Sequence, residues 1–246
     1  DIPDSVAQAS AAAARVSEIL GMGKIESEPP TATVIRSKCA ACLTCTRVCP
    51  YNAINPKAVT FAEVIPTQCE GCGICTASCP GEAIVLPNFE DLNVDTSLEK
   101  LLASNPTPTG EQQVIAFCCD HGAYEAADLC GSMRLDLPVQ FKILRLPCSG
   151  KVEVQYLLKA IELGADGVMV IGCKDGNCNY KNGSERARKR VEEAKRLLKE
   201  IGLDDTRLEM FNISSSLADQ FREVVVNMTE RTKTLGPTFE RKEVVA

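Results

Sequence analysis

The sequence predicts an α+β domain built from an internal repeat, followed by an α/β domain with a small parallel sheet and helices on both faces. In the first half, a cysteine-rich segment recurs at an offset of 30 residues, from Val34 to Val64. In the second half, short apolar runs alternate with helical stretches, which is typical of strand–helix–strand units. The chain has 246 residues, 45% of them hydrophobic, so both domains can bury real cores without disulfides.

Composition excludes several classes of protein. The formal net charge is −6 and no basic stripe is present, which argues against nucleic acid as a partner. No apolar run approaches the roughly 18–20 residues of a membrane span, so we expect no direct membrane insertion. Residue 1 is not Met, so we expect a segment of a longer chain. No signal peptide is present, so we expect a cytoplasmic location. The 14 cysteines are therefore not expected to form the disulfide scaffold of a secreted protein.

The first 33 residues are predicted to form a helix and a linker. Residues 5–20 are rich in alanine, and Val6, Ala13, Val16 and Leu20 recur with a helical period. The face of small residues predicts a close neighbour, and we expect it to pack on the following domain. Residues 21–33, with their glycines and prolines, are typical of a linker.

The repeat gives the most specific pattern in the chain. Residues 34–54 and 64–84 share Val-Ile, four cysteines, a Thr, a Pro and a closing Ala-x-Ile. Each copy reads C-x₂-C-x₂-C-x₃-C-P, the run used by bacterial ferredoxins with two iron–sulfur clusters. We therefore predict an α+β two-cluster ferredoxin domain over residues 34–88.

The spacing also predicts which thiols share a cluster. Three thiolates two residues apart can wrap one [4Fe–4S] cluster, and the fourth cysteine of the run ligates the other cluster. The expected ligands are Cys39, Cys42, Cys45 and Cys79 for cluster I, and Cys69, Cys72, Cys75 and Cys49 for cluster II. Gly71 and Gly73 are expected to let backbone N–H groups approach the sulfurs of cluster II. A pair of zinc sites is the alternative, but two complete copies with crossed ligands and prolines favour iron–sulfur chemistry.

The second domain is predicted to begin after a linker at residues 89–110. This linker includes a short helix at 96–104 and ends in the run N-P-T-P-T-G. Within residues 111–246, strands are predicted at 114–117, 143–146, 168–171 and 208–213. Helices are predicted at 123–133, 152–163, 184–201 and about 217–234. Helix 184–201 has one apolar stripe, and we expect its Arg and Lys side chains to be solvated rather than to bind an acidic partner.

Five cysteines follow the ends of these predicted strands: Cys118, Cys119, Cys148, Cys173 and Cys178. Because open α/β sheets build their sites at the carboxyl ends of strands, we expect these thiols to converge. Four interpretations remain open: a [2Fe–2S] cluster, a zinc site with His121, a dithiol–disulfide pair, or reduced core cysteines without a role. Cys130, inside a helix, is expected to be an ordinary buried residue. The chain has no G-x-G-x-x-G fingerprint and no Ser/His/Asp set, so we predict no dinucleotide or hydrolase site.

The two halves resemble two known families. The ferredoxin motif, preceded by D-I-P-D-S-V-A-Q-A-S-A-A-A-A-R, is similar to the C-terminal ferredoxin part of the A-type subunit of heterodisulfide reductase, where such a segment closes the flavoprotein domain. The second half resembles the delta subunit of methyl-viologen-reducing hydrogenase. The matching stretches include A-F-C-C at 116–119, R-L-P-C-S-G-K-V at 145–152 and A-D-G-V-M-V-I-G-C at 165–173.

This resemblance implies a [2Fe–2S] cluster in the second domain. Its expected ligands are Cys119, Cys148, Cys173 and Cys178, with Cys118 as a substitute. The chain departs from the delta family at Gly122, where the family usually has a cysteine, and at Lys174 and Asn179, where histidine is frequent. Five of the family's six cysteines remain, enough for four ligands.

The resemblance also implies a function. It is that of an electron-transfer segment in an anaerobic oxidoreductase complex, relaying electrons between a hydrogenase or formate dehydrogenase and a flavin-containing subunit, together with B-type and C-type subunits of heterodisulfide reductase. FAD is expected in the complete complex but not in this segment, and no residue here is expected to turn over a substrate. The chain also resembles the C-terminal part of the B-type subunit of the quinone-interacting membrane-bound oxidoreductase. That alternative implies a link to adenylylsulfate reductase and a docking domain without a cluster. A dithiol enzyme and a structural adaptor are further alternatives.

Overall fold

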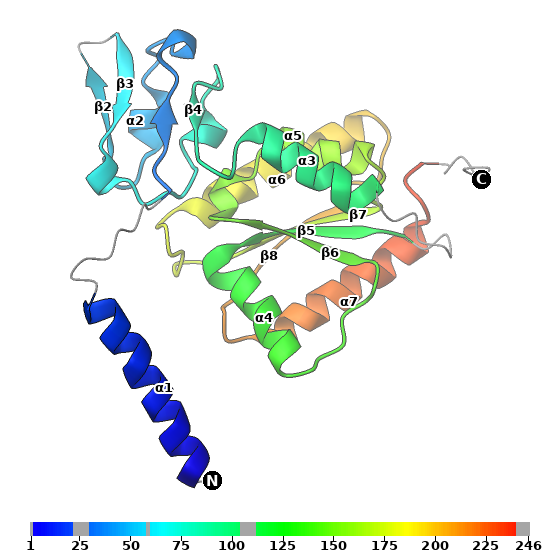
Figure 1. Cartoon of the computed structure of the whole chain (residues 1–246). Coiled ribbons are helices and arrows are strands. Elements are labelled where there is room, and N and C mark those ends of the chain that lie inside the picture. Colours follow the sequence, from blue (N-terminus) through cyan, green and yellow to red (C-terminus); the bar gives the residue numbers. More distant parts are fainter. Residues whose placement is uncertain (1, 22–29, 58–59, 104–111, 240–246) are drawn as a thin grey trace.

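The computed structural model describes residues 2–21, 30–57, 60–103 and 112–239, which form an N-terminal helix and two domains (Figure 1). Helix α1 (Ile2–Gly21) confirms the helix expected over 5–20. The expectation that it packs on the next domain is wrong for the described residues. Val6, Val16 and Leu20 are 59%, 54% and 74% exposed, and α1 stands apart in Figure 1. Residues 22–29 of the expected linker lie outside the described residues.

The first domain contains two short antiparallel pairs of β-strands. Strand β1 (Thr33–Val34) pairs with β4 (Ile84–Val85), and β2 (Ile54–Lys57) pairs with β3 (Phe61–Val64). The cysteine runs lie between these strands. Each copy of the repeat supplies a helical turn before its first cysteine, η1 (Arg36–Lys38) or η2 (Pro66–Gln68), and another before its fourth, α2 (Thr44–Val48) or η3 (Thr76–Ser78). The sequence repeat is therefore a repeat of structure, and the two copies share one small core.

Both cysteine loops contain residues in the left-handed conformation. Gly71 and Gly73 have φ angles of 68° and 75°, and Ala41 and Leu43, at the same positions in the other copy, have 53° and 58°. A loop that wraps three thiols around one centre needs these two left-handed residues, whichever side chain stands there. A residue other than glycine adopts this conformation at a cost of roughly 1–2 kcal/mol.

Gly71 gives a stability prediction. A Cβ built on Gly71 would lie 2.4 Å from the carbonyl oxygen of Pro30, in addition to the strain of its positive φ. We expect Gly71→Ala to destabilise the protein by about 2 kcal/mol, which lowers the midpoint of thermal unfolding by roughly 4–8 °C. The matched variant Ala41→Gly relieves strain in the other copy and should not lower the midpoint. An unchanged midpoint for Gly71→Ala would contradict this account.

The second domain has a four-stranded parallel sheet with the strand order β6-β5-β7-β8. The strands are β5 (Val114–Cys119), β6 (Phe141–Leu146), β7 (Gly167–Gly172) and β8 (Leu208–Asn212). All four predicted strands are confirmed, within two residues at each end. In this sheet β5 comes first along the chain, β6 pairs with one of its edges, and β7 pairs with the other edge and is followed by β8. The strand order therefore reverses between β5 and β7.

Helices cover both faces of this sheet, as predicted (Figure 1). One face carries α3 (Asp91–Ala103), α5 (Val154–Glu162) and α6 (Gly183–Glu200), and the other carries α4 (Glu125–Ser132) and α7 (Ala218–Leu235). Alternate residues of β5 point to opposite faces, so Phe117 joins one core with Tyr156, whereas Ala116 joins the other with Phe221. Both strand faces are buried, which explains the uninterrupted apolar runs of β5 and β7.

Two elements differ from the sequence-based expectation. The short helix expected at 96–104 begins at Asp91, and its Val94, Leu98 and Leu102 are buried in the second domain's core. The described part of the expected linker is therefore a packed helix, and residues 104–111 lie outside the described residues. The helix expected at 123–133 begins earlier as a π-helical turn at Asp120–Tyr124. Among the described residues, no helix is long and apolar enough to cross a membrane.

Candidate metal centres

The eight cysteines of the repeat line two separate cavities in the first domain. The first cavity is lined by Cys39, Cys42, Cys45 and Cys79. The second is lined by Cys49, Cys69, Cys72 and Cys75. Each cavity thus receives three thiols from one copy and the fourth from the other, which is the crossed grouping expected from the spacing.

Backbone N–H groups already point at several of these sulfurs. The N–H of Ala53 donates to Cys49 Sγ at 3.4 Å, and the N–H of Ala83 donates to Cys79 Sγ at 3.3 Å, at the same position of the two copies. The N–H of Ala32 donates to Cys69 Sγ at 3.5 Å. Such donors stabilise thiolate sulfur bound to iron, so the donor set and its surroundings fit a [4Fe–4S] cluster in each cavity.

The two cavities differ in their access to solvent. Cys42 is exposed, and its contact with Thr44 lowers the pKa of its thiol. Cys72 and Cys75 are buried, and this burial raises the pKa of Cys72 to about 11 and that of Cys75 further. The first cavity therefore has one cysteine exposed to water, whereas in the second cavity Cys72 packs against Cys148 of the second domain.

The second-domain thiols meet where the strand order reverses. Cys119 ends β5 and Cys173 follows β7, and their sulfurs are 3.6 Å apart. Cys148 follows β6 and lies against the same edge of the sheet. Parallel α/β sheets form their binding sites at this point, because the loops from neighbouring strands separate there and leave a crevice. The topology thus explains how cysteines more than 20 residues apart come together.

Cys178 completes a continuous set of contacting thiols. Its sulfur and that of Cys148 both face Gly183, and hydrogen bonding to Cys148 and Cys173 lowers the pKa of Cys178. The same hydrogen bond raises the pKa of Cys148, and bonds to Cys119 and Cys178 raise the pKa of Cys173. The bond from Cys173 lowers the pKa of Cys119. Four neighbouring thiols of this kind form a soft, negatively charged donor set once metal displaces their protons.

The other residues considered for this site lie elsewhere. Cys118 is fully buried, and with Cys130 it lies in the core beneath α4 and α7. Burial raises the pKa of Cys118 well above its ordinary value, and Cys130 Sγ donates to the carbonyl oxygen of Ala218 at 3.1 Å. His121 is exposed, with Nε2 at 3.1 Å from the Tyr180 hydroxyl. The contacting set is thus Cys119, Cys148, Cys173 and Cys178.

Two glycines leave room around these four sulfurs. A Cβ on Gly183 would lie 2.2 Å from Cys148 Sγ, and one on Gly122 would lie 3.2 Å from Cys173 Sγ and 3.3 Å from Cys119 Sγ. Backbone N–H groups of Ala123 and Gly150 donate to the sulfurs of Cys119 and Cys148 at 3.5 and 3.4 Å. Four thiols, two backbone N–H donors and two glycines without side chains beside the sulfurs fit a small iron–sulfur cluster such as [2Fe–2S].

The two domains contact each other between the second thiol set (Cys49, Cys69, Cys72 and Cys75) and the third (Cys119, Cys148, Cys173 and Cys178). Cys72, Ile74 and Cys148 form one buried apolar cluster, against which Cys178 and Tyr180 pack. Close approach depends on glycine on both sides. A Cβ on Gly150 would lie 2.7 Å from Ile74 Cγ1, and a Cβ on Gly73 would lie 3.0 Å from Lys151 Cβ. Ile74 thus packs in one cluster with a cysteine of each domain.

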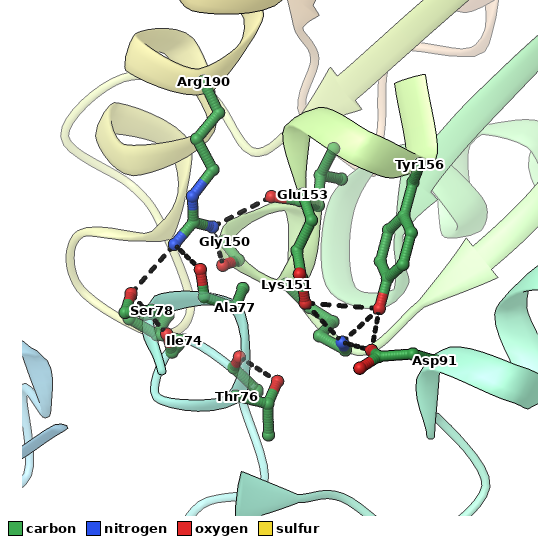
Figure 2. A network of polar contacts seen from close by, with 12 residues as sticks. Ile74, Thr76, Ala77, Ser78, Asp91, Gly150, Lys151, Glu153, Tyr156 and Arg190 are labelled. Carbon is green, nitrogen blue, oxygen red and sulfur yellow. Dashed lines mark hydrogen bonds and ion pairs between the residues drawn. The ribbon is translucent and has the colours of Figure 1, made fainter. Parts of the chain in front are cut away.

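Two cations at this contact were not identified from the sequence. Lys151 is fully buried, and its ammonium contacts Asp91, Glu153 and Tyr156 (Figure 2). Arg190 lies on α6, whose Arg and Lys side chains were expected to be solvated, yet it is half-buried against the first domain. The sequence could have indicated this position for Arg190. It follows Ala187 by three residues and precedes Ala194 by four, so it lies on the same face of α6 as these two buried alanines.

Comparison with known proteins identifies the second domain. Residues 114–236 match the family described as methyl-viologen-reducing hydrogenase, delta subunit. The chain belongs to this family. A second match, to the 4Fe-4S dicluster domain family, covers residues 38–84 of this delta-subunit family member. Both halves of the resemblance drawn from the sequence are therefore confirmed.

Individual relatives show the same two-part relationship. The chain is 38% identical over 244 residues to the A-type subunit of ferredoxin:CoB-CoM heterodisulfide reductase from Methanosarcina mazei, a match that covers 96% of this chain but 29% of that protein. It is 47% identical over 124 residues to the D-type iron-sulfur subunit of the F420-non-reducing hydrogenase vhu from Methanocaldococcus jannaschii, covering 50% of this chain and 92% of that protein. This delta-subunit family member thus spans less than a third of the length of its heterodisulfide reductase relative.

Proposed function

We propose that this chain is the iron–sulfur electron-transfer segment of a heterodisulfide reductase-type complex. Its partners would be a hydrogenase or formate dehydrogenase on one side and a flavin-containing subunit on the other. The observation that carries this proposal is the contact of Cys72 and Ile74 with Cys148, which joins a thiol set of one domain to that of the other. The printed names of the relatives, one from a heterodisulfide reductase and one from a hydrogenase, support the choice of partners.

Three sets of cysteines would hold the clusters. They are Cys39, Cys42, Cys45 and Cys79; Cys49, Cys69, Cys72 and Cys75; and Cys119, Cys148, Cys173 and Cys178. Iron–sulfur clusters in such sets take up and release single electrons without changing a bond to an organic substrate. The chain's own residues supply ligation, backbone N–H groups aimed at sulfur, and burial of most of the cysteines of the second and third sets.

The arrangement of the sets suits a relay with two ends. The second set shares one core with the first set and a cluster with Cys148 of the third, whereas the first set has the exposed Cys42. We propose that one partner exchanges electrons at the second domain and the other at the first-copy side. FAD would belong to the complete complex, since this segment provides no fingerprint for it.

Cys148 allows a direct test by iron analysis. Anaerobically prepared wild-type protein is expected to contain about 10 iron atoms per chain, and Cys148→Ala about 8, with loss of the EPR signal of a reduced [2Fe–2S] centre. Cys130→Ala is the matched control, because Cys130 is an equally buried thiol outside the set. It should keep the full count.

Two results would contradict the proposal. A wild-type count of about 8 would remove the third cluster and favour the docking-domain alternative linked to a quinone-interacting complex. A full count that survives Cys148→Ala but falls in Cys118→Ala would move the site to the other cysteine of β5.

A further inference from the structure

Arg190 joins the two domains through four hydrogen bonds. Its Nη1 donates to the carbonyl oxygens of Gly150 and Val152 at 2.7 and 2.9 Å, both in the second domain. Its Nη2 donates to the carbonyl oxygen of Ala77 and to Ser78 Oγ at 2.8 and 2.9 Å, both in the first domain (Figure 2). Each terminal nitrogen of one planar guanidinium therefore serves a different domain.

The segments held by Arg190 are those that carry the candidate ligands. Ala77 and Ser78 lie in η3, between Cys75 of the second set and Cys79 of the first. Gly150 and Val152 lie in and just after η5 (Ser149–Lys151), which follows Cys148 of the third set. Ser78 Oγ also donates to the carbonyl oxygen of Ile74, which packs in one cluster with Cys72 and Cys148. The guanidinium is thus connected to the backbone beside all three sets.

We propose that Arg190 is a positioning residue for electron transfer between the domains, fixing η3 against η5 so that Cys72, Ile74 and Cys148 stay packed together. This inference rests on the proposed function. Arginine suits the role because its donors are held in one rigid plane, which fixes both distance and orientation between two backbones. A lysine ammonium carries the same charge but is a point donor on a flexible stem, so it cannot hold both segments at once.

The test uses the whole cluster-loaded chain and three variants. Arg190→Met removes the guanidinium and keeps most of the apolar stem. Arg190→Lys keeps the charge. Arg196→Met is the matched control on the same helix, where the side chain is 57% exposed and pairs with Glu193 and Glu200. Iron and labile sulfide are measured for each variant, together with EPR coupling between the second-domain and first-domain centres and the rate of electron redistribution between them after pulsed reduction.

We expect Arg190→Met to keep its iron, to lose much of the EPR coupling, and to redistribute electrons at least about tenfold more slowly, because reaction rates depend steeply on the placement of the reacting groups. Arg190→Lys should fall between Arg190→Met and wild type, and Arg196→Met should match wild type. A readout independent of the metal centres is hydrogen exchange. The amides of Lys151 and Val152 should exchange about tenfold faster in Arg190→Met, since one lost charged hydrogen bond costs about 1.4 kcal/mol.

The possible failures are distinguishable. Faster amide exchange with unchanged coupling and unchanged redistribution would make Arg190 a stabilising contact only, and would overturn the positioning role. An Arg190→Met protein with wild-type EPR coupling, electron redistribution and amide exchange would overturn the positioning role as well. If Arg190→Met fails to fold, an Arg190→Lys protein that shows wild-type coupling and rate overturns the proposal. A wild-type chain without a second-domain centre would overturn the proposed function itself, and this role with it.

Discussion

Replacing Lys151 by methionine is expected to lower the midpoint of thermal unfolding by roughly 6–12 °C, because breaking a buried ion pair costs about 3 kcal/mol. The Lys151 side chain is 1% exposed, and its ammonium lies 2.8 Å from both Asp91 Oδ1 and Glu153 Oε1. Methionine fills the space of the stem but leaves these carboxylates without their cation. We place the cost at the lower end for such pairs because the Asp91 side chain is 37% exposed and keeps some hydration.

Two controls sharpen this experiment. Lys159→Met removes a lysine from α5 whose partner, Glu162, is 70% exposed, and should change the midpoint little. The double variant Lys151→Met with Asp91→Asn removes one of the unpaired charges and should recover part of the loss. A drop for Lys151→Met no larger than that for Lys159→Met would show that the buried cation contributes no stability.

The same network makes stability depend on pH at the acidic end. Burial alone would raise the pKa of Asp91, but hydrogen bonds from Lys151 and Tyr156 outweigh it and hold this pKa below its ordinary value. A carboxyl with a lowered pKa in the folded state stabilises the protein above its unfolded pKa of about 3.9, and this contribution is lost as the pH falls further. Wild-type protein should therefore lose more stability than Lys151→Met between pH 5 and pH 3.

The second large effect is expected from Gly183→Ala. A Cβ at this position would lie 2.2 Å from Cys148 Sγ and 3.4 Å from Cys178 Sγ, so one added methyl group must displace a sulfur of the third thiol set. We expect the iron content to fall by about two atoms per chain, with loss of the [2Fe–2S] signal. The first-domain centres should remain.

Gly131→Ala is the matched control for this variant. It also places a methyl group on a helix of the second domain, but a Cβ there meets nothing within 4 Å. It should keep all its iron and gain up to about 1 kcal/mol from the better helix propensity of alanine. If Gly183→Ala also keeps its full iron content, the third centre is not held by Cys148 and Cys178 as proposed.

Much of the architecture was predictable because its causes are local. The cysteine spacing of the repeat restricts which thiols can meet, and the alternation of apolar runs with helical periods indicates a parallel sheet. The position of Cys119 and Cys173 after strands then implied that they converge, which the 3.6 Å contact between their sulfurs bears out. The left-handed conformation of Ala41 and Leu43 could not be read from these side chains, because residues other than glycine adopt it rarely.

What could not be predicted depends on contacts between distant segments. The exposed α1 and the packed α3 have similar helical patterns, and only α3 has a sheet beside it. Lys151 and Arg190 look like surface residues in sequence. Lys151 is buried and Arg190 half-buried because η3 of one domain fits against η5 and α6 of the other, and this contact joins residues more than 100 positions apart.

The pair Leu43 and Gly73 has a consequence for the duplicated unit. The two occupy the same place in the repeat with the same backbone conformation, yet a side chain at position 73 would run into the stem of Lys151. The two copies of the repeat are therefore not interchangeable. If the first copy stood in place of the second, its leucine would clash with Lys151 and push the second domain away. The copy with Gly73 packs against the second domain and has no room for a larger residue there, whereas the copy with Leu43 has that room. The two cysteine loops of the repeat therefore have different surroundings, one facing the second domain and the other reaching solvent through Cys42.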